Sequence, residues 1–62
     1  MLFRWACGWA ECKHRQKGEA EKYGAVVLTC EKCRKESRAL IAIRPQDNMS
    51  IAVDVVPIVR DQ

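Results

Sequence analysis

Short apolar runs of strand length alternate with polar stretches along this chain. The segment LFRWA, residues 2–6, is one such run, and YGAVVLT, residues 23–29, is rich in the β-branched and aromatic residues that strands prefer. Between them, the charged stretch KHRQKGEAEK, residues 13–22, is interrupted by Gly18 and predicts a solvated loop or a single helical turn. The first half of the chain therefore predicts two strands with an irregular segment between them.

The second half predicts a β-hairpin. The runs RALIAIR, residues 38–44, and MSIAVDVV, residues 49–56, flank the turn-forming sequence PQDN. Pro45 suits the first central position of a type I turn, and Asp47 or Asn48 can take the left-handed conformation that closes it.

The register of this hairpin follows from the side-chain pattern, because a slip of one residue sends every side chain to the other face. With an odd number of loop residues, Ile43 faces Met49 and Arg38 faces Asp54, so that apolar pairs and the charged pair lie on opposite faces. With an even number, Ala39 would face Asp54. We therefore predict the odd loop.

These elements predict a small all-β fold, a zinc-ribbon-like antiparallel sheet of three to four strands. We expect one domain over residues 1–62, with its core in residues 3–56 and a tail in residues 57–62. Pro57 has no amide hydrogen, so the last strand should end there or lie at a sheet edge. A chain of 62 residues buries only about 60% of its unfolded surface, and such domains usually need a disulfide, a metal or a partner.

The ends of the chain predict a cytoplasmic protein. The N-terminal MLFRWACGWAEC carries Arg4 and Glu11 and lacks the long apolar run and cleavage site of an export signal. The uncharged VVPIV near the C-terminus is far shorter than the roughly 20 residues that span a bilayer, so we expect no membrane contact. Persistent disulfides are rare in the cytosol, which favours metal binding or redox chemistry for the cysteines.

The four cysteines form two close pairs. Four residues separate Cys7 from Cys12, seventeen separate Cys12 from Cys30, and two separate Cys30 from Cys33. Two tight turns of this kind, brought together by the intervening strands, supply the four ligands of a tetrahedral Zn²⁺ site. We predict that these cysteines hold one structural Zn²⁺ and that the chain is largely unfolded without it.

Other roles for these residues are possible. His14 becomes a ligand only if Cys7 or Cys12 does not bind; otherwise it is one more polar residue. A redox dithiol at Cys30 and Cys33 would need the helix start of a βαβ unit, and a disulfide would suit an exported protein. Catalytic zinc needs an open coordination position, which four cysteines do not leave, so we expect no enzyme.

The turns CGWAEC and CEKC, flanked by short antiparallel strands, resemble the zinc-ribbon class over residues 3–56. The stretch YGAVVLTCEKCRKESRALIAI is similar to the Com-like zinc-finger translational regulators of Mu-like phages. Ribbon turns usually have two residues between the cysteines and often a glycine after the second. Here the first turn has four, and neither second cysteine precedes a glycine. The resemblance implies transcription, ribosomal, RNA-regulatory or protein-docking roles.

Positive charge gathers near the cysteines. Residues 1–44 hold ten Lys and Arg against five Glu, whereas residues 45–62 hold one Arg against three Asp. This cluster predicts contact with RNA or DNA in the regulation of gene expression. The residues predicted to contact nucleic acid are Trp9, Lys13, Arg15, Lys17, Lys32, Arg34 and Lys35. The same cations would also stabilise the −2 charge of four thiolates around Zn²⁺ without any nucleic acid.

The aromatic side chains have two possible roles. Trp5, Trp9 and Tyr23 could stack on unpaired bases. Alternatively, Phe3, Trp5 and Trp9 pack together as the core of a small domain, and we expect this for Phe3 and Trp5.

The apolar hairpin offers a second function. Residues 49–56 are more apolar than a minimal ribbon needs, and a free strand edge of that content is usually covered or paired with another chain. The alternative function is thus a protein-interaction module, such as a small phage or accessory factor, that docks on a larger protein or forms a homodimer through this hairpin.

Overall fold

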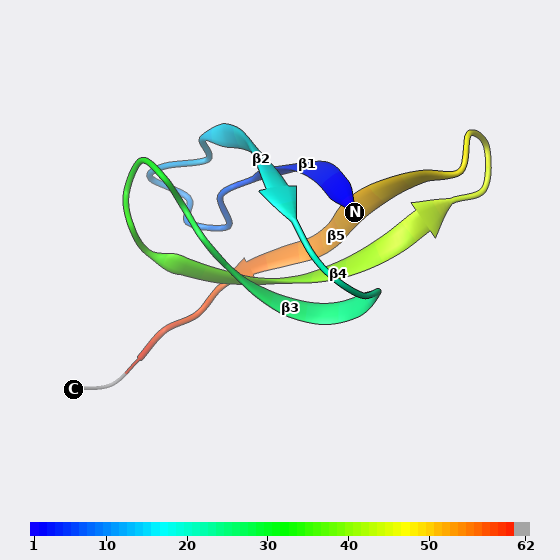
Figure 1. Cartoon of the computed structure of the whole chain (residues 1–62). Helices are drawn as coiled ribbons and strands as arrows, with labels where there is room; N and C mark the ends of the chain where they lie inside the picture. The colour runs from blue at the N-terminus through cyan, green and yellow to red at the C-terminus, as the bar shows by residue number, and fades with distance from the viewer. Residues whose placement is uncertain (61–62) are drawn as a thin grey trace.

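The computed structural model describes residues 1–60 and contains two antiparallel sheets (Figure 1). Strand β1, Leu2–Ala6, pairs with β2, Arg15–Glu19, in a two-stranded ribbon. Strands β3, Gly24–Thr29, β4, Glu36–Arg44, and β5, Met49–Pro57, form a three-stranded sheet with β4 in the centre. No residue from 1 to 60 is helical, and the predicted small antiparallel all-β fold is confirmed.

Strand β2 lies where the sequence predicted a loop or a helical turn. Gln16 and Gly18 are half-buried, whereas Arg15, Lys17 and Glu19 are exposed. The strand thus has an inner and an outer side, but no inner residue is apolar. Its pairing with β1 stabilises it, which a local pattern does not reveal. The prediction was therefore wrong at this segment.

The hairpin register also differs from the prediction. Arg44 pairs with Met49, so the loop holds four residues, an even number, and Ile43 faces Ser50 instead of Met49. The turn itself has the predicted chemistry. Asn48 takes a left-handed conformation with φ of +57°, and its amide donates to the Arg44 carbonyl at 2.8 Å.

A β-bulge explains the register. Leu40 pairs with Val53, but Arg38 pairs with Val56 instead of the predicted Asp54, so β5 places two residues opposite the single Ala39. Asp54 has a φ of +52° and is exposed. The extra residue reverses the alternation of side chains, so the charged Asp54 leaves the inner face of the sheet. The odd loop was predicted for a regular ladder, in which an even loop would place Asp54 opposite Ala39 on the inner face. The bulge moves Asp54 off that face, so the even loop no longer buries a charge.

The core lies between the ribbon and the inner face of the three-stranded sheet. Phe3 and Trp5 of β1 are buried, as the sequence predicted. They belong to one cluster with Leu28, Ala39 and Ile41, and two cysteines complete its buried members. The core is therefore small, and part of it consists of the candidate metal ligands.

The end of β5 agrees with the prediction from Pro57. The strand ends at Pro57 and lies at the edge of the sheet. The next amide, that of Ile58, donates to the Glu36 carbonyl at 3.1 Å. Residues 61–62 of the predicted tail lie outside the described residues. Among residues 1–60, no helix has the length and apolarity needed to cross a membrane.

Candidate metal centre

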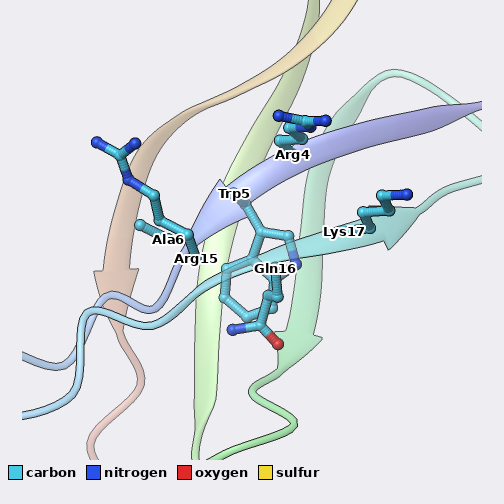
Figure 2. Close-up of a pocket in the computed structure, with 6 residues that line it drawn as sticks. All are labelled: Arg4, Trp5, Ala6, Arg15, Gln16 and Lys17. Carbon is cyan, nitrogen blue, oxygen red and sulfur yellow. The ribbon is translucent and has the colours of Figure 1, made fainter.

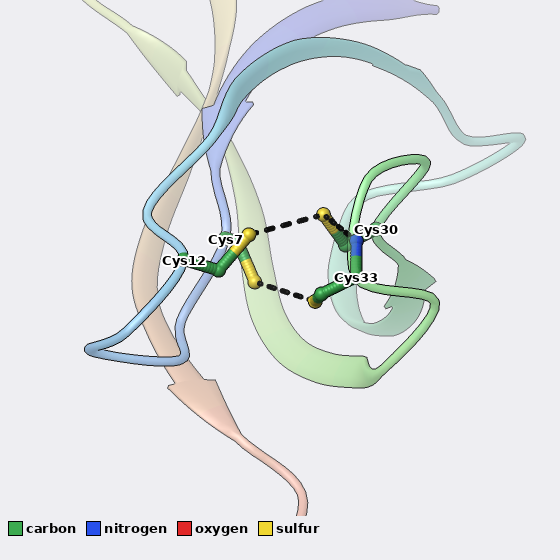
Figure 3. Close-up of side chains that lie close together, drawn as sticks. All are labelled: Cys7, Cys12, Cys30 and Cys33. Carbon is green, nitrogen blue, oxygen red and sulfur yellow. Dashed lines mark hydrogen bonds between the residues drawn. The ribbon is translucent and has the colours of Figure 1, made fainter.

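The four cysteines converge at one end of the two sheets (Figure 3). Cys7 and Cys12 belong to the connection between β1 and β2, and Cys30 and Cys33 belong to the turn between β3 and β4. The four Sγ atoms all lie within 4.8 Å of one another. The Cys7–Cys33 and Cys12–Cys30 sulfurs are each 3.7 Å apart, and all four cysteines are free of disulfides. The structure thus brings the predicted ligands together.

Each cysteine pair sits on a hydrogen-bonded turn. In the first turn, the Cys12 amide donates to the Trp9 carbonyl at 3.0 Å; in the second, the Arg34 amide donates to the Cys30 carbonyl at 3.0 Å. Lys13 and Arg34, which follow the second cysteine of each pair, have φ of +48° and +65°. They take the left-handed conformation that glycine adopts most easily. The absence of a glycine after the second cysteine of each pair therefore does not prevent the turns from closing.

Gly8 lets the first turn approach the three-stranded sheet. Its amide donates to the buried Ser37 hydroxyl at 3.1 Å. A Cβ added at Gly8 would lie 2.8 Å from the backbone carbonyl carbon of Val56 and 3.0 Å from the Pro57 nitrogen. Only glycine fits this contact, which positions the first pair of cysteines against the second.

Cys30 lies in an environment that favours its thiolate. Desolvation by burial raises its pKa, but donors to its sulfur outweigh that effect and lower the pKa to about 6. These donors are the backbone amides of Cys33 and Lys32, at 3.5 and 3.4 Å, and the side-chain amide of Gln16, at 3.3 Å. Cys30 therefore loses its proton more readily than an ordinary thiol, and the thiolate is the form that binds a metal ion.

The first pair of cysteines behaves differently. Burial raises the pKa of Cys7. The backbone hydrogen bond with His14 lowers the pKa of Cys12, but burial and the neighbouring thiols raise it to about 11. Four adjacent sulfurs cannot all ionise without a compensating cation, because like charges at this distance repel. A bound metal ion would supply that charge and displace the thiol protons.

Gln16 links the ribbon to the second cysteine turn. Besides its contact with Cys30, its Nε2 donates to the His14 carbonyl at 3.2 Å, and its Oε1 accepts from the Glu31 amide at 2.9 Å. Gln16 was not among the predicted site residues. Its only sequence signal would have been a polar residue at an inner position of a strand that was not predicted.

Replacing Gln16 with Leu is expected to weaken metal affinity by about 10- to 100-fold, because ligand-orienting hydrogen bonds outside the coordination shell contribute about that much. Competition against a chromogenic chelator measures the change. Gln46→Leu, in the exposed hairpin loop, is the matched control and should leave the affinity unchanged. Equal affinities for the two variants would contradict this role of Gln16.

His14 lies beside the cluster but outside it. Its Nε2 is 3.0 Å from a carboxylate oxygen of Glu31. The four cysteines are grouped without it. This placement favours the interpretation of His14 as a polar surface residue.

Two residues predicted to contact nucleic acid already have partners within the chain. Lys35 lies 3.2 Å from a Glu11 carboxylate oxygen, and its Nζ lies 4.5 Å from the centroid of the Trp9 ring. The Trp9 Nε1 donates to the Glu36 carbonyl at 2.8 Å, and the ring packs against the core. Of the other aromatic candidates, Trp5 is buried and Tyr23 is half-exposed. Trp5 and Trp9 therefore have structural roles.

The ribbon presents a separate group of cations, which we call the basic ribbon face: Arg4, Arg15 and Lys17. Arg4 lies directly opposite Lys17, and Arg15 lies opposite Ala6, so all three belong to the outer face. Figure 2 shows them on one side of the ribbon, with Trp5 and Gln16 on the other. They line a cleft of about 410 Å³. Among the described residues, none of the three forms an ion pair.

The basic ribbon face includes two predicted residues, Arg15 and Lys17, and one that was not predicted, Arg4. Lys13, Lys32 and Arg34 lie instead on the cysteine turns. Arg4 precedes the cysteines in the sequence, so its position gave no reason to group it with the cations that follow them. Only the pairing of β1 with β2 places it beside Arg15 and Lys17.

Comparisons with protein-family models, with curated proteins and with solved structures found no match for this chain. The resemblance to zinc ribbons and to Com-like regulators therefore stays a prediction. What the structure establishes is a small all-β fold with four cysteines at metal-binding distance from one another.

Proposed function

We propose that the four cysteines hold one structural Zn²⁺. A tetrahedral zinc ion with bonds of about 2.3 Å to sulfur places its ligand sulfurs about 3.8 Å apart. The 3.7 Å separations of the two sulfur pairs agree with this spacing. Four thiolates also leave no open position for water or substrate, which supports a binding module over an enzyme. Elemental analysis of the purified protein should give one zinc ion per chain.

We infer that this zinc-stabilised module binds nucleic acid in the regulation of gene expression. The observation that carries the proposal is the basic ribbon face. Like charges directly opposite each other on two strands are destabilising, and Arg4 opposite Lys17 is such a pair. A bound phosphate would relieve the repulsion, and the Arg15 guanidinium can donate two hydrogen bonds to it.

The cations on the cysteine turns have a different role in this proposal. Lys13, Lys32 and Arg34 lie close in sequence to the ligands, where they offset the −2 charge of the zinc site. Lys35 is already paired with Glu11. These residues contribute less to phosphate binding than the basic ribbon face does.

Replacing Arg4, Arg15 and Lys17 together with Ala is expected to weaken binding and to flatten its salt dependence. Each lost phosphate contact lowers the slope of log K against log salt concentration by about 0.7 to 1, so the slope should fall by about 2 to 3. Fluorescence anisotropy of a labelled oligonucleotide at several salt concentrations measures both quantities.

The control variant removes the same number of charges elsewhere, at Lys22, Arg38 and Arg60. It should keep most of the slope. If the two triple variants lose affinity and slope equally, net charge alone governs binding and the basic ribbon face has no special part in it.

A second candidate function is protein docking or homodimerisation, which the outer face of the three-stranded sheet favours. Val27 and Val56 are 56% and 49% exposed. They belong to the same face as Leu40 and Val53, because Arg38 pairs with both valines and Leu40 pairs with Val53. An antiparallel sheet usually has one polar face, so apolar residues on both faces suggest a covered surface.

Replacing Val53 and Val56 with Asp is expected to abolish self-association or partner binding through this face. Size-exclusion chromatography with light scattering, with and without an oligonucleotide, measures the mass. Val56 is exposed and Val53 is half-buried on the outer face of the sheet, so Asp at these two positions should leave zinc content unchanged. A monomer at every concentration tested would argue against the homodimer.

A further inference from the structure

A second cleft, of about 510 Å³, lies between the ribbon and the β4–β5 hairpin. In Figure 1 the start of β1 lies beside the start of β5, and β1 packs against β5. Much of the lining is apolar, with Phe3 at its buried side and Ile51 half-buried. Leu2 and Met49, also in the lining, are 71% and 58% exposed. The volume falls in the roughly 300–1,000 Å³ range of small-molecule sites.

The apolar lining of this cleft is continuous with the basic ribbon face. Arg4 and Lys17 line both the second cleft and the cleft on the ribbon. At the hairpin side, Arg44 is neutralised by Asp47, to which its Nε donates at 3.1 Å. The cleft therefore has an apolar part and a single cationic end with no ion pair among the described residues.

This juxtaposition matches the two parts of a nucleotide. A base is flat and largely apolar on its faces, whereas its phosphate is anionic. In a duplex the base faces are stacked on one another and cannot enter a cleft, but in a single strand they are free to pack on protein side chains. Among nucleic acids, the cleft thus suits one with unpaired bases.

We propose that the cleft between β1 and β5 takes an unpaired base while Arg4 and Lys17 hold the flanking phosphates, so that the partner is single-stranded nucleic acid. The proposal rests on the proposed nucleic-acid function and narrows its ligand class. The base packs on Leu2 and Met49, and Arg15 extends the phosphate contacts along the ribbon.

Three DNA probes of equal length test the proposal with the zinc-loaded chain: a single strand, the duplex of the same sequence, and an abasic strand that keeps only the sugar-phosphate backbone. Fluorescence anisotropy should show the single strand binding several-fold more tightly than the abasic strand, because the abasic strand lacks the base that packs on Leu2 and Met49. The duplex should also bind more weakly than the single strand. An RNA single strand is run beside them, and a preference for either single strand over duplex and abasic backbone supports the proposal.

The variant Leu2→Ser with Met49→Ser keeps the charge and tests the cleft itself. Both side chains are exposed, so zinc content and thermal unfolding should stay close to wild type. The preference for the single strand over the abasic strand should fall several-fold, with the salt slope unchanged. Val59→Ser, at a residue 74% exposed and outside the cleft lining, is the control and should keep the preference.

The outcomes separate this proposal from the one on which it rests. Equal binding of all three DNA probes, with no tighter binding of the RNA strand, would overturn the single-strand proposal and leave nucleic-acid binding in place. A single-strand preference that survives in the Leu2 and Met49 variant would overturn the assignment to this cleft. Binding of none of the probes, RNA included, would overturn the proposed function and this inference together.

Discussion

Removing the metal with a strong chelator is expected to unfold the chain. Structural zinc contributes an apparent ~10–16 kcal/mol in small finger peptides near neutral pH, whereas the net stability of a typical domain is about 5–15 kcal/mol. Near-ultraviolet circular dichroism and the dispersion of the amide NMR spectrum, recorded before and after chelation, measure the loss. Adding back one equivalent of Zn²⁺ should restore both signals, and Mg²⁺ should not.

The structure gives the reason for this dependence. Cys7 and Cys12 lie on the ribbon connection, and Cys30 and Cys33 lie on the sheet connection, so one ion bound by all four would join the two layers. Cys7 and Cys30 are also among the buried residues of the core. Without the ion, the two cysteine turns lose the metal–sulfur bonds between them and keep only weak sulfur–sulfur contacts of 3.7 Å in their place. An unchanged, well-dispersed spectrum after prolonged chelation would contradict the structural role of the metal.

Replacing Gly8 with Ala is expected to destabilise the zinc-loaded protein by about 1–3 kcal/mol or more, the usual cost of an added group in a packed site. The added Cβ meets backbone atoms of Val56 and Pro57, which cannot move aside as a flexible side chain would. Relief of the contact pushes the first cysteine turn away from β5, so metal affinity should fall as well. Urea unfolding and chelator competition measure the two effects.

Ala10→Ser is the control for Gly8→Ala. Ala10 is exposed in the same turn, and such surface substitutions usually change stability by no more than about 0.5 kcal/mol. If Gly8→Ala matched this control in both stability and metal affinity, the close approach of the first turn to β5 would not matter for the fold.

Much of the fold follows from local sequence patterns. The strands that carry apolar residues were predictable, because alternation and β-branched content act over a few neighbouring residues. Strand β2 was not predictable in this way. Its inner positions hold Gln16, which bonds the second cysteine turn, and Gly18, where an added Cβ would lie 2.5 Å from the Phe3 ring. Both residues are explained by contacts with distant parts of the chain.

The hairpin register shows the same limit. The conflict between Asp54 and the inner face of the sheet was predictable from the side-chain pattern, but only for a regular ladder. The bulge at Asp54 resolves the conflict at the cost of one left-handed residue, which Asp tolerates better than most. A bulge depends on the pairing of two strands and cannot be recognised from the sequence of either strand alone.

The sequence by itself determined the two cysteine turns, the apolar strands and the end of β5 at Pro57, because each depends on residues a few positions apart. Only the tertiary structure decided which cations have no carboxylate partner within residues 1–60 and which are neutralised. It set Arg4 beside Arg15 and Lys17, paired Lys35 with Glu11, and enclosed the cleft between β1 and β5. Charge and apolar surface become a site only when strand pairing brings distant residues together, and strand pairing is a property of the whole fold.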